Sequence, residues 1–233
     1  MNKLRQTPIF RFARKLKRLI KPPIHRPEVN LNFSLLGSEY GGWPVLAGSL
    51  NSESRIYSFG IGHDISFDLE VIALFDCVVE AFDPTPRCMT WLKKQELPDK
   101  FRFHPVGLSD QTEVLEFFAP PEDNYVSFTI AKREDSSESV ALPVHALDEL
   151  MSQLGDFTLD YLKMDIEGAE YPVVYDMIKK SILPTQLCIE FHHGKFGFTA
   201  GETREAVSAL QSVGYRIFYV STSGREYGFK LNK

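Results

Sequence analysis

The stretch YSFGIGHDISFD, residues 57–68, carries the strongest indication of the fold. A short apolar run, RIYSF (55–59), stops at Gly60, a second glycine follows at Gly62, and an acidic segment begins at Asp64. Apolar residues recur at helical spacing over 64–75, so the pattern predicts a strand, a tight turn and a helix. In open α/β sheets, small molecules bind outside the carboxyl ends of strands, where this turn lies.

Strand and helix patterns alternate on the C-terminal side of this turn. We expect strands over 77–83, 101–110, 113–120, 138–147, 160–165 and 186–192, and helices over 86–97, 146–155, 169–181 and 203–214. Such alternation predicts a mainly parallel sheet covered on both faces. The last two strands, 215–221 and 226–232, are joined by a short turn and must therefore be antiparallel.

The composition indicates one globular α/β domain. The chain has 233 residues, of which 43% are hydrophobic and 24% charged, which is ordinary for a soluble domain. Cys77, Cys88 and Cys188 are too few and too scattered for a disulfide framework. Cys77 and Cys188 sit in apolar runs, so we expect buried thiols in a reducing compartment. No apolar run approaches the roughly 18 residues of a membrane span, and the N-terminus lacks a secretory pattern. We therefore expect a cytoplasmic protein.

Charge is distributed unevenly along the chain. Residues 1–27 hold nine of the 26 Lys and Arg and no acid, so the rest has 17 basic and 31 acidic residues, a net charge of −14. An acidic body argues against extended nucleic-acid binding. We divide the chain at the Pro-rich linker KPPIHRP (21–27) into a basic extension, residues 1–27, and one domain, residues 28–233.

The basic extension has an amphipathic pattern. Ile9, Phe12, Leu16 and Ile20 lie near one helical face with basic residues around them. We predict a helix over residues 8–21 that contacts an anionic membrane surface or a partner. A solvated, disordered arm explains the same composition equally well, and an organelle-targeting segment is a third interpretation.

The charges around the glycine turn favour one kind of ligand. A dinucleotide fingerprint needs a third glycine where this chain has Ile65. The following helix opens with Asp64 and adds Asp68 and Glu70, with no Lys or Arg between residues 56 and 86. These acids disfavour a pyrophosphate at the helix N-terminus and suit a cofactor that carries an ammonium and a sulfonium. The alternative is a plain tight turn, with Asp64 as a helix N-cap.

Several blocks together resemble one family. YSFGIGHDISFD (57–68), AFDPTP (81–86), HPVGLSD (104–110), LKMDIEGAEYPVV (162–174) and LCIEFHH (187–193) are similar to FkbM-type S-adenosylmethionine-dependent methyltransferases over roughly residues 38–231. The resemblance implies the class I methyltransferase fold, an α/β fold with a seven-stranded, mostly parallel sheet and one antiparallel strand near the C-terminus. His63 departs from the family pattern, which often has Glu there.

The resemblance also implies residues that bind S-adenosylmethionine. Asp83 ends the second strand, 21 residues after Gly62, where an acid can accept both hydroxyls of an adenosine ribose. The implied set is Gly60, Gly62 and Asp64 around the methionine moiety, Asp83 on the ribose, Pro84 beside the adenine, Gly107, Leu108 and Ser109 along the adenine edge, and Asp110 on its exocyclic amine. An ordinary turn explains GLSD (107–110) equally well.

Catalysis is expected at the ends of two later strands. Asp165, Glu190 and His192 follow strands that the topology makes neighbours, so their side chains can converge. In one arrangement, which we prefer at this stage, His192 takes the acceptor proton while a carboxylate orients it. In the other, the three side chains bind a divalent metal. Glu170 is expected only to support the next helix, and residues 40–43 either cover the acceptor pocket or pack as a flap.

These observations predict methyl transfer from S-adenosylmethionine to a hydroxyl of a small molecule, sugar or natural product. Holding donor and acceptor in line supplies much of the catalysis in such a displacement. A dinucleotide-dependent oxidoreductase is the alternative enzyme, which Ile65 and the acidic helix start count against. A cofactor-binding module without catalysis is the third hypothesis.

Overall fold

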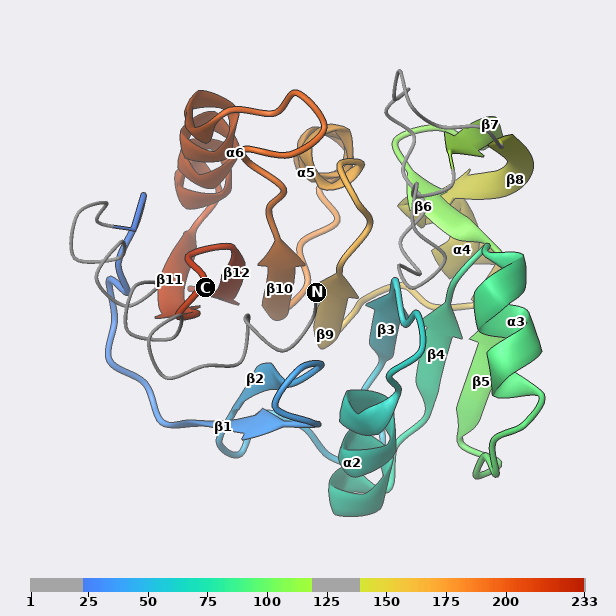
Figure 1. Ribbon diagram of the computed structural model, residues 1–233. Helices are drawn as coiled ribbons and strands as arrows, with labels where there is room; N and C mark the ends of the chain where they lie inside the picture. Colours follow the sequence, from blue (N-terminus) through green and yellow to red (C-terminus); the bar gives the residue numbers. More distant parts are fainter. Residues whose placement is uncertain (1–22, 119–138, 233) are drawn as a thin grey trace, which may run out of the picture.

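The computed structural model describes residues 23–118 and 139–232 (Figure 1). Its helices are α2 (Ser66–Phe75), α3 (Pro86–Leu92), α4 (Leu147–Leu154), α5 (Glu170–Lys179) and α6 (Ala200–Ser212). Its strands are β1 (Phe33–Leu36), β2 (Trp43–Leu46), β3 (Ile56–Phe59), β4 (Val79–Phe82), β5 (Phe101–His104), β6 (Gly107–Ser109), β7 (Glu113–Phe118), β8 (Ser139–Ala146), β9 (Tyr161–Met164), β10 (Gln186–Glu190), β11 (Tyr215–Val220) and β12 (Glu226–Leu231).

The main sheet has seven strands in the order β11-β12-β10-β9-β3-β4-β5. The strands from β10 to β5 pair in parallel, and β12 runs antiparallel to both β10 and β11. The predicted antiparallel pairing of the last two strands is therefore confirmed. Strand order reverses between β3 and β9, which makes their carboxyl ends the switch point where open α/β sheets bind ligands.

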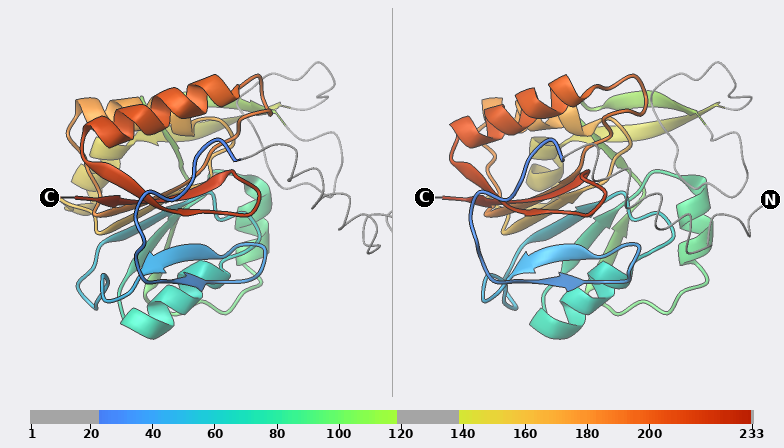
Figure 2. Two further views of the ribbon diagram at one scale, coloured as in Figure 1. Left: turned by 90° about the vertical axis from the view of Figure 1, so that its left-hand side faces the viewer. Right: turned by 60° about the vertical axis from the view of Figure 1, so that its left-hand side comes forward.

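Two layers cover the main sheet, as Figure 2 shows. Helices α4, α5 and α6 bury apolar side chains such as Leu150, Val174 and Val207 against one face. Helices α2 and α3 and the β1–β2 hairpin pack on the other face, where Phe67 and Trp43 join a second apolar cluster. Burial on both faces explains why the parallel strands are almost continuously apolar.

Alternate side chains of β9 pack on opposite faces of the main sheet. Leu162 and Met164 enter the cluster on the α5 side, whereas Tyr161 enters the cluster on the α2 side. Lys163 lies on the α2 side as well, because successive side chains of a strand point to opposite faces. This placement brings a buried lysine beneath the turn after β3, where it has a structural role described below.

The structure corrects two expectations about strands. The single strand expected over 101–110 is wrong: β5 ends at His104, Pro105 has no amide hydrogen for the ladder, and β6 joins β8 and β7 in a separate three-stranded sheet. The turn-rich segment 38–48 was not expected to contain a strand, but Trp43–Leu46 pairs antiparallel with Phe33–Leu36.

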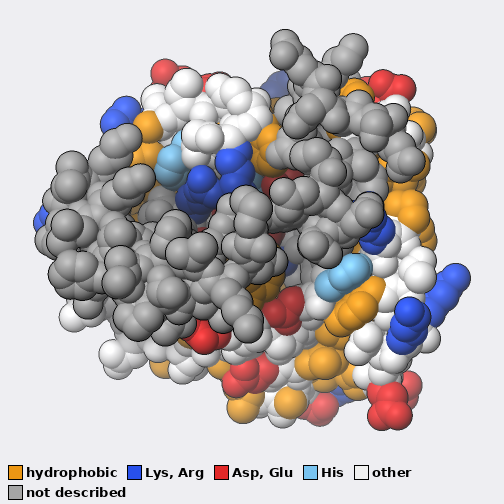
Figure 3. All heavy atoms as spheres, viewed as in Figure 1, with side chains coloured by type: hydrophobic (Ala, Val, Ile, Leu, Met, Phe, Trp, Pro, Cys, Tyr) orange, Lys and Arg blue, Asp and Glu red, His pale blue; other side chains and the backbone are white. Residues whose placement is uncertain are grey.

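Other expectations concern the ends and the surface. The amphipathic segment 8–21 lies outside the described residues. The ring of His25, in the expected linker, packs edge-on against Tyr227, so contacts with the domain begin before residue 28. The described part of the face in Figure 3 presents acidic, basic and apolar side chains together.

Two further observations concern the cysteines and the helices. Cys77 and Cys188 are buried and free, as predicted, and Cys88 is buried and free as well. None of the helices between residues 23 and 118 or between 139 and 232 has the length and apolarity needed to cross a bilayer.

Candidate active site

A cavity of about 280 Å³ opens at the carboxyl ends of β3, β4 and β9. Eight predicted site residues line it: Gly60, Gly62, Asp64, Asp83, Pro84, Gly107, Leu108 and Asp165. Further lining residues include Tyr40, Phe82, Thr85, Leu115, Phe117, Val144 and Glu167. The cavity therefore lies at the switch point of the sheet, where the glycine turn was expected to hold a ligand.

The two glycines of the turn have different surroundings. A Cβ added at Gly60 would lie 1.7 Å from the carbonyl oxygen of Asp165, whereas one added at Gly62 would meet nothing within 4 Å. Gly60 therefore allows the ends of β3 and β9 to approach each other, and Gly62 leaves room in the cavity. Both have positive φ angles, 74° and 53°, which favour glycine.

Lys163 supports the same turn from below. Its Nζ donates hydrogen bonds to the carbonyl oxygens of Phe59 and Gly60, each at 3.1 Å, and lies 5.3 Å from the centroid of the Trp43 ring. The side chain is buried, and buried Asp68 interacts electrostatically with it. A buried ammonium needs such partners, so this lysine fixes the carbonyl groups of the turn.

Asp64 lines the cavity but is also tied to the β1–β2 hairpin. Its Oδ2 accepts a hydrogen bond from Ser38 Oγ at 2.5 Å, and its Oδ1 accepts one from the Ser66 amide at 2.9 Å. Burial opposes ionisation of this carboxyl, but the bonds from Ser38 and Ser66 outweigh it and lower the pKa of Asp64. The sequence suggested an N-cap or a cofactor contact and did not reveal this link to the hairpin.

Asp83 organises the neighbouring turn. Its Oδ2 accepts the amide of Gly62 at 2.9 Å, and its Oδ1 accepts the amide and the hydroxyl of Thr85 at 2.9 and 2.5 Å. A carboxylate offers about four acceptor positions, so these three bonds leave about one position for a further donor, and Asp83 lines the cavity. Asp83 therefore joins the two turns on which a ribose is expected to lie.

Two predicted adenine contacts lie elsewhere. Ser109 and Asp110 are not among the residues that line the cavity. Residues 107–109 form strand β6, which pairs with β8, and Ser109 is buried there with its Oγ bonded to Asp110 at 3.2 Å. Residues 107–109 are thus a strand and not the alternative turn, and of GLSD (107–110) only Gly107 and Leu108 line the cavity.

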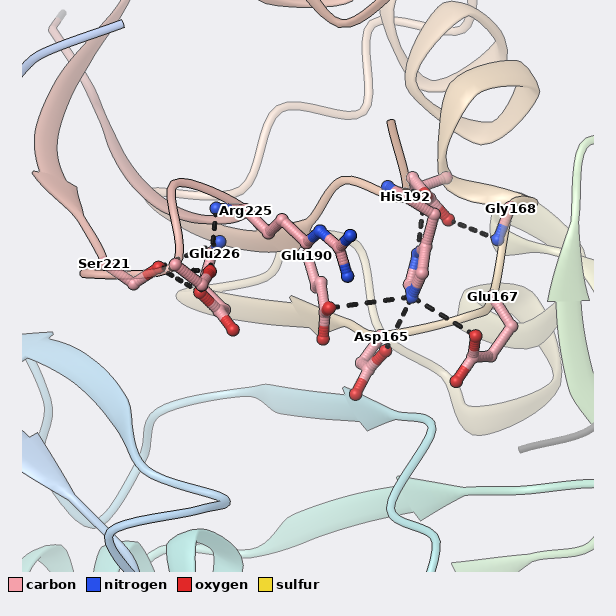
Figure 4. Close-up of polar contacts among 10 residues, drawn as sticks. Asp165, Glu167, Gly168, Glu190, His192, Ser221, Arg225 and Glu226 are labelled. Atoms are coloured by element: carbon pink, nitrogen blue, oxygen red, sulfur yellow. Dashed lines mark hydrogen bonds and ion pairs between the residues drawn. The ribbon is translucent and has the colours of Figure 1, made fainter. Parts of the chain in front are cut away.

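An acid–histidine cluster, consisting of Asp165, Glu167, Glu190 and His192, adjoins the cavity (Figure 4). Nε2 of His192 lies 3.3 Å from Glu167 Oε2, 3.7 Å from Asp165 Oδ1 and 3.7 Å from Glu190 Oε1. The predicted convergence of Asp165, Glu190 and His192 is therefore observed, and it follows from the parallel pairing of β9 with β10.

Glu170 has a larger role than its expected support of helix α5. Its Oε1 accepts hydrogen bonds from the amide and from Nδ1 of His192, at 2.8 and 2.9 Å, and its Oε2 accepts the amide of Gly168 at 2.8 Å. The side chain is 0% exposed. The carboxylate that orients His192 is thus Glu170, which the helix-dipole argument did not identify.

The carboxylates also change the protonation of the cluster. Burial opposes the charged form of His192, but the hydrogen bond and the charge of Glu170, helped by Asp165 and Glu167, raise its pKa to about 9. Burial and then the charges of Glu190 and Glu167 raise the pKa of Asp165 well above its usual range. A histidine with that pKa is protonated near neutral pH, which counts against its acting as a base when no cation is bound.

Several lining residues were not predictable from the sequence pattern. Glu167 lies two residues after Asp165, and nothing in the strand pattern singled it out. Leu115, Phe117 and Val144 belong to β7 and β8, whose alternating apolar residues predicted strands but not their position beside the cavity. Tyr40, which is 94% exposed, was noted as a residue that could cover a pocket.

A cavity at the switch point of a Rossmann-like sheet, with an acid–histidine cluster beside it, is the arrangement in which open α/β domains bind small ligands. Residues 29–217 match the family described as the methyltransferase FkbM domain. The chain belongs to this family, and the resemblance seen in its motifs is confirmed.

Individual relatives are more distant. The chain is 23% identical over 179 residues to the human protein described as probable methyltransferase-like protein 24, a match that covers 72% of this chain and 43% of that protein. The crystal structure of methyltransferase FkbM from Methylobacillus flagellatus aligns with a TM-score of 0.47 and 12% identity over 78% of this chain and 44% of that one. The fibrillarin pre-rRNA processing protein of Methanococcus jannaschii aligns with a TM-score of 0.40 and 13% identity over 78% and 67%. The chain thus spans less than half the length of the first two relatives.

Proposed function

We propose that this domain transfers a methyl group from S-adenosylmethionine to a hydroxyl oxygen of a small acceptor, such as a sugar or a natural product. The observation that carries the proposal is the charge of the cavity. Its lining includes the carboxylates of Asp64, Asp83, Asp165 and Glu167, and no Lys or Arg among the described lining residues. Such a cavity attracts a ligand with ammonium and sulfonium groups and repels a pyrophosphate.

The lining of the cavity supports one orientation of the proposed cofactor. Apolar side chains on the β6–β8–β7 side, among them Leu108 and Phe117, suit an adenine ring, while Asp83 has acceptor capacity for the ribose. The open side of Gly62 suits the methionine part. We interpret the main sheet, with β12 as its antiparallel strand, as the class I methyltransferase fold.

The acceptor then approaches from the side of the acid–histidine cluster. Asp165 lines the cavity and also belongs to the cluster, and Tyr40 lines the cavity from the hairpin. In the reaction, the acceptor oxygen forms a bond to the methyl carbon as the sulfur–carbon bond breaks, the electron pair of that bond stays on sulfur, and the hydroxyl proton passes to a solvent water. Alignment of the two reactants supplies much of the rate enhancement.

The proposed activity is tested by turnover. The full chain is incubated with S-adenosylmethionine and a panel of hydroxylated sugars and natural products, and S-adenosylhomocysteine and methylated products are measured by mass spectrometry. We expect both products, in equal amounts, with at least one acceptor. Oxidation of an alcohol with NAD would contradict the proposal, and tight cofactor binding without turnover on any acceptor would favour the non-catalytic hypothesis.

A pair of variants tests the position of the cofactor. Asp83→Ala removes a charged acceptor, and each hydrogen bond to a charged group contributes roughly 1.5–3 kcal/mol, so we expect at least tenfold weaker binding of S-adenosylmethionine. Asp110→Ala is the matched control because Asp110 does not line the cavity. Equal affinities of the two variants would place the ribose elsewhere.

A further inference from the structure

We propose that Asp165, Glu190 and His192 bind a divalent cation of the Mg²⁺ or Mn²⁺ type at the edge of the cavity. Each residue offers one ligand atom, and these atoms all lie within 4.8 Å of one another. The role of the cation in catalysis rests on the proposed methyl transfer, but the site itself is argued from the described side chains alone.

The spacing of the ligand atoms is close to what an octahedral ion needs. Neighbouring ligands at about 2.1 Å from such an ion lie about 3 Å apart. Nε2 of His192 is 3.7 Å from the oxygens of both Asp165 and Glu190, so small side-chain rotations bring them to that distance. Asp165 and Glu190 follow paired parallel strands, and this pairing fixes the backbone from which they project.

His192 is held in the orientation of a metal ligand. Its Nδ1 donates to Glu170, which is 0% exposed, and its Nε2 faces the three carboxylates of the cluster. Metal-binding histidines characteristically donate their second nitrogen to a carboxylate, which fixes the ring and its tautomer. His192 is itself 1% exposed, so solvent does not provide its Nε2 with an alternative partner.

Asp165 supplies an independent observation. Its Oδ1, the atom nearest to Nε2 of His192, is a buried oxygen without a hydrogen-bond partner among the described residues. Leaving such an acceptor unsatisfied costs about 1–3 kcal/mol, and more when it is charged. A cation between Asp165, Glu190 and His192 would satisfy this atom and offset the repulsion between the carboxylates.

The donor set and its position indicate which ion binds and what it does. The two carboxylates suit Mg²⁺ and Mn²⁺, whereas the imidazole suits transition-metal ions, so Mn²⁺ matches the mixed donor set best. Three protein ligands leave open positions on an octahedral ion, and Asp165 and Glu167 line the cavity. An acceptor hydroxyl bound at an open position has a lowered pKa, and its proton passes to a solvent water as the methyl group is transferred.

This arrangement replaces the one preferred from the sequence. When Nε2 of His192 binds the ion, the nitrogen has no free electron pair with which to take the acceptor proton. The competing explanation of the same geometry is that a protonated His192 compensates the surrounding carboxylates without any metal. The two explanations differ in whether the protein binds the ion, so ion binding is the measurement that separates them.

Binding is measured by titrating the full chain, treated with chelator and dialysed, with Mn²⁺ and following the electron paramagnetic resonance signal of the free ion. We expect one saturable site per chain and, in pulsed spectra of the bound ion, coupling to an imidazole nitrogen. Absence of saturable binding by the wild-type protein overturns the proposal, and so does bound Mn²⁺ without nitrogen coupling.

Three variants locate the site. Glu190→Gln removes a ligand, so we expect the affinity for Mn²⁺ to fall at least tenfold. Glu170→Gln alters the residue that positions His192, and we expect it to lower the affinity for Mn²⁺ about tenfold or more. Glu80→Gln is the matched control, because Glu80 pairs with another histidine, His104, at 2.6 Å outside this cluster. Circular dichroism verifies that each variant folds. Equal affinity in all three variants and the wild-type protein would place the ion elsewhere.

Activity measurements keep this inference separate from the proposed function. If the cation site is correct, EDTA abolishes methyl transfer and Mn²⁺ or Mg²⁺ restores it. Methyl transfer that is unaffected by EDTA, in protein that binds no Mn²⁺, supports the proposed function and rejects the cation. Saturable Mn²⁺ binding at this site without methyl transfer supports the cation site and rejects the proposed function.

Discussion

Gly60 and Gly62 lie in the same turn, and substitution of each should have a different consequence. An alanine Cβ at residue 60 would overlap the carbonyl oxygen of Asp165, so the ends of β3 and β9 must separate. We expect Gly60→Ala to lower the free energy of unfolding by about 3 kcal/mol or more, as severe overpacking does. Urea unfolding followed by fluorescence measures this loss.

Gly62→Ala is the matched substitution. Its Cβ would enter open space, and the positive φ of residue 62 costs only about 1–2 kcal/mol with a side chain. We expect this variant to fold but to bind S-adenosylmethionine more weakly, because Gly62 lines the cavity. A larger loss of stability in Gly62→Ala than in Gly60→Ala would show that our account of the turn is wrong.

Asp68 should make stability depend on pH. Burial raises its pKa to about 6, although Lys163 opposes the shift. Between about pH 4 and 6, the native protein keeps a proton that the unfolded chain releases, so stability falls as the pH rises through this range and remains lower above it. The contribution is about 3 kcal/mol, at about 1.4 kcal/mol for each unit of pKa.

Asp68→Asn should remove this pH dependence. Urea unfolding of both proteins at pH 4 and pH 7 gives the free energy of unfolding of each. The difference between them, variant minus wild type, should be more positive at pH 7 than at pH 4. Parallel stability curves for the two proteins would show that Asp68 ionises normally in the native state.

The sequence predicted which residues converge at the acid–histidine cluster, but not the carboxylate that orients His192. Asp165, Glu190 and His192 were expected to converge because strand pairing alone brings their backbones together. The bond from His192 to Glu170 joins residues 22 apart in sequence, and it depends on how the start of α5 packs against the segment after β10. No periodicity encodes that contact, so the orienting carboxylate emerged only from the structure.

At the scale of elements, the β1–β2 hairpin is attached to the start of α2 through Ser38. Its Oγ donates to Asp64 at 2.5 Å and accepts the amide of Gly41 at 2.8 Å. We expect Ser38→Ala to cost about 1–2 kcal/mol and to increase amide hydrogen exchange at residues 38–41. Ser52→Ala, at an exposed position, is the control; equal exchange in both variants would mean that Ser38 does not hold the hairpin.

Elements were predictable where periodicity was regular and less so elsewhere. The buried strands β3, β4, β9 and β10 and the helices between them follow directly from apolar runs and helical spacing. The hairpin was missed because residues 38–48 are rich in turn formers, and its strands are stabilised by packing against α2. The division of 101–110 into two strands depends on Pro105, whose effect on the ladder was overlooked.

At the scale of the whole molecule, the basic extension and the cavity should act independently. We expect deletion of residues 1–24 to leave binding of S-adenosylmethionine unchanged, because every described lining residue lies after this segment. From the basic composition of the segment, we predict that the full chain sediments with anionic vesicles and that the shortened chain does not. If the full chain does not sediment, the membrane interpretation of residues 8–21 is wrong.

The central claim is that the acidic cavity at the switch point between β3 and β9 binds S-adenosylmethionine. Isothermal titration calorimetry of the full chain with S-adenosylmethionine, and separately with NAD, tests it most directly. We predict one site per chain with a micromolar dissociation constant for S-adenosylmethionine and no comparable affinity for NAD. Binding of NAD with equal or greater affinity, or no heat of binding with S-adenosylmethionine, would contradict the claim.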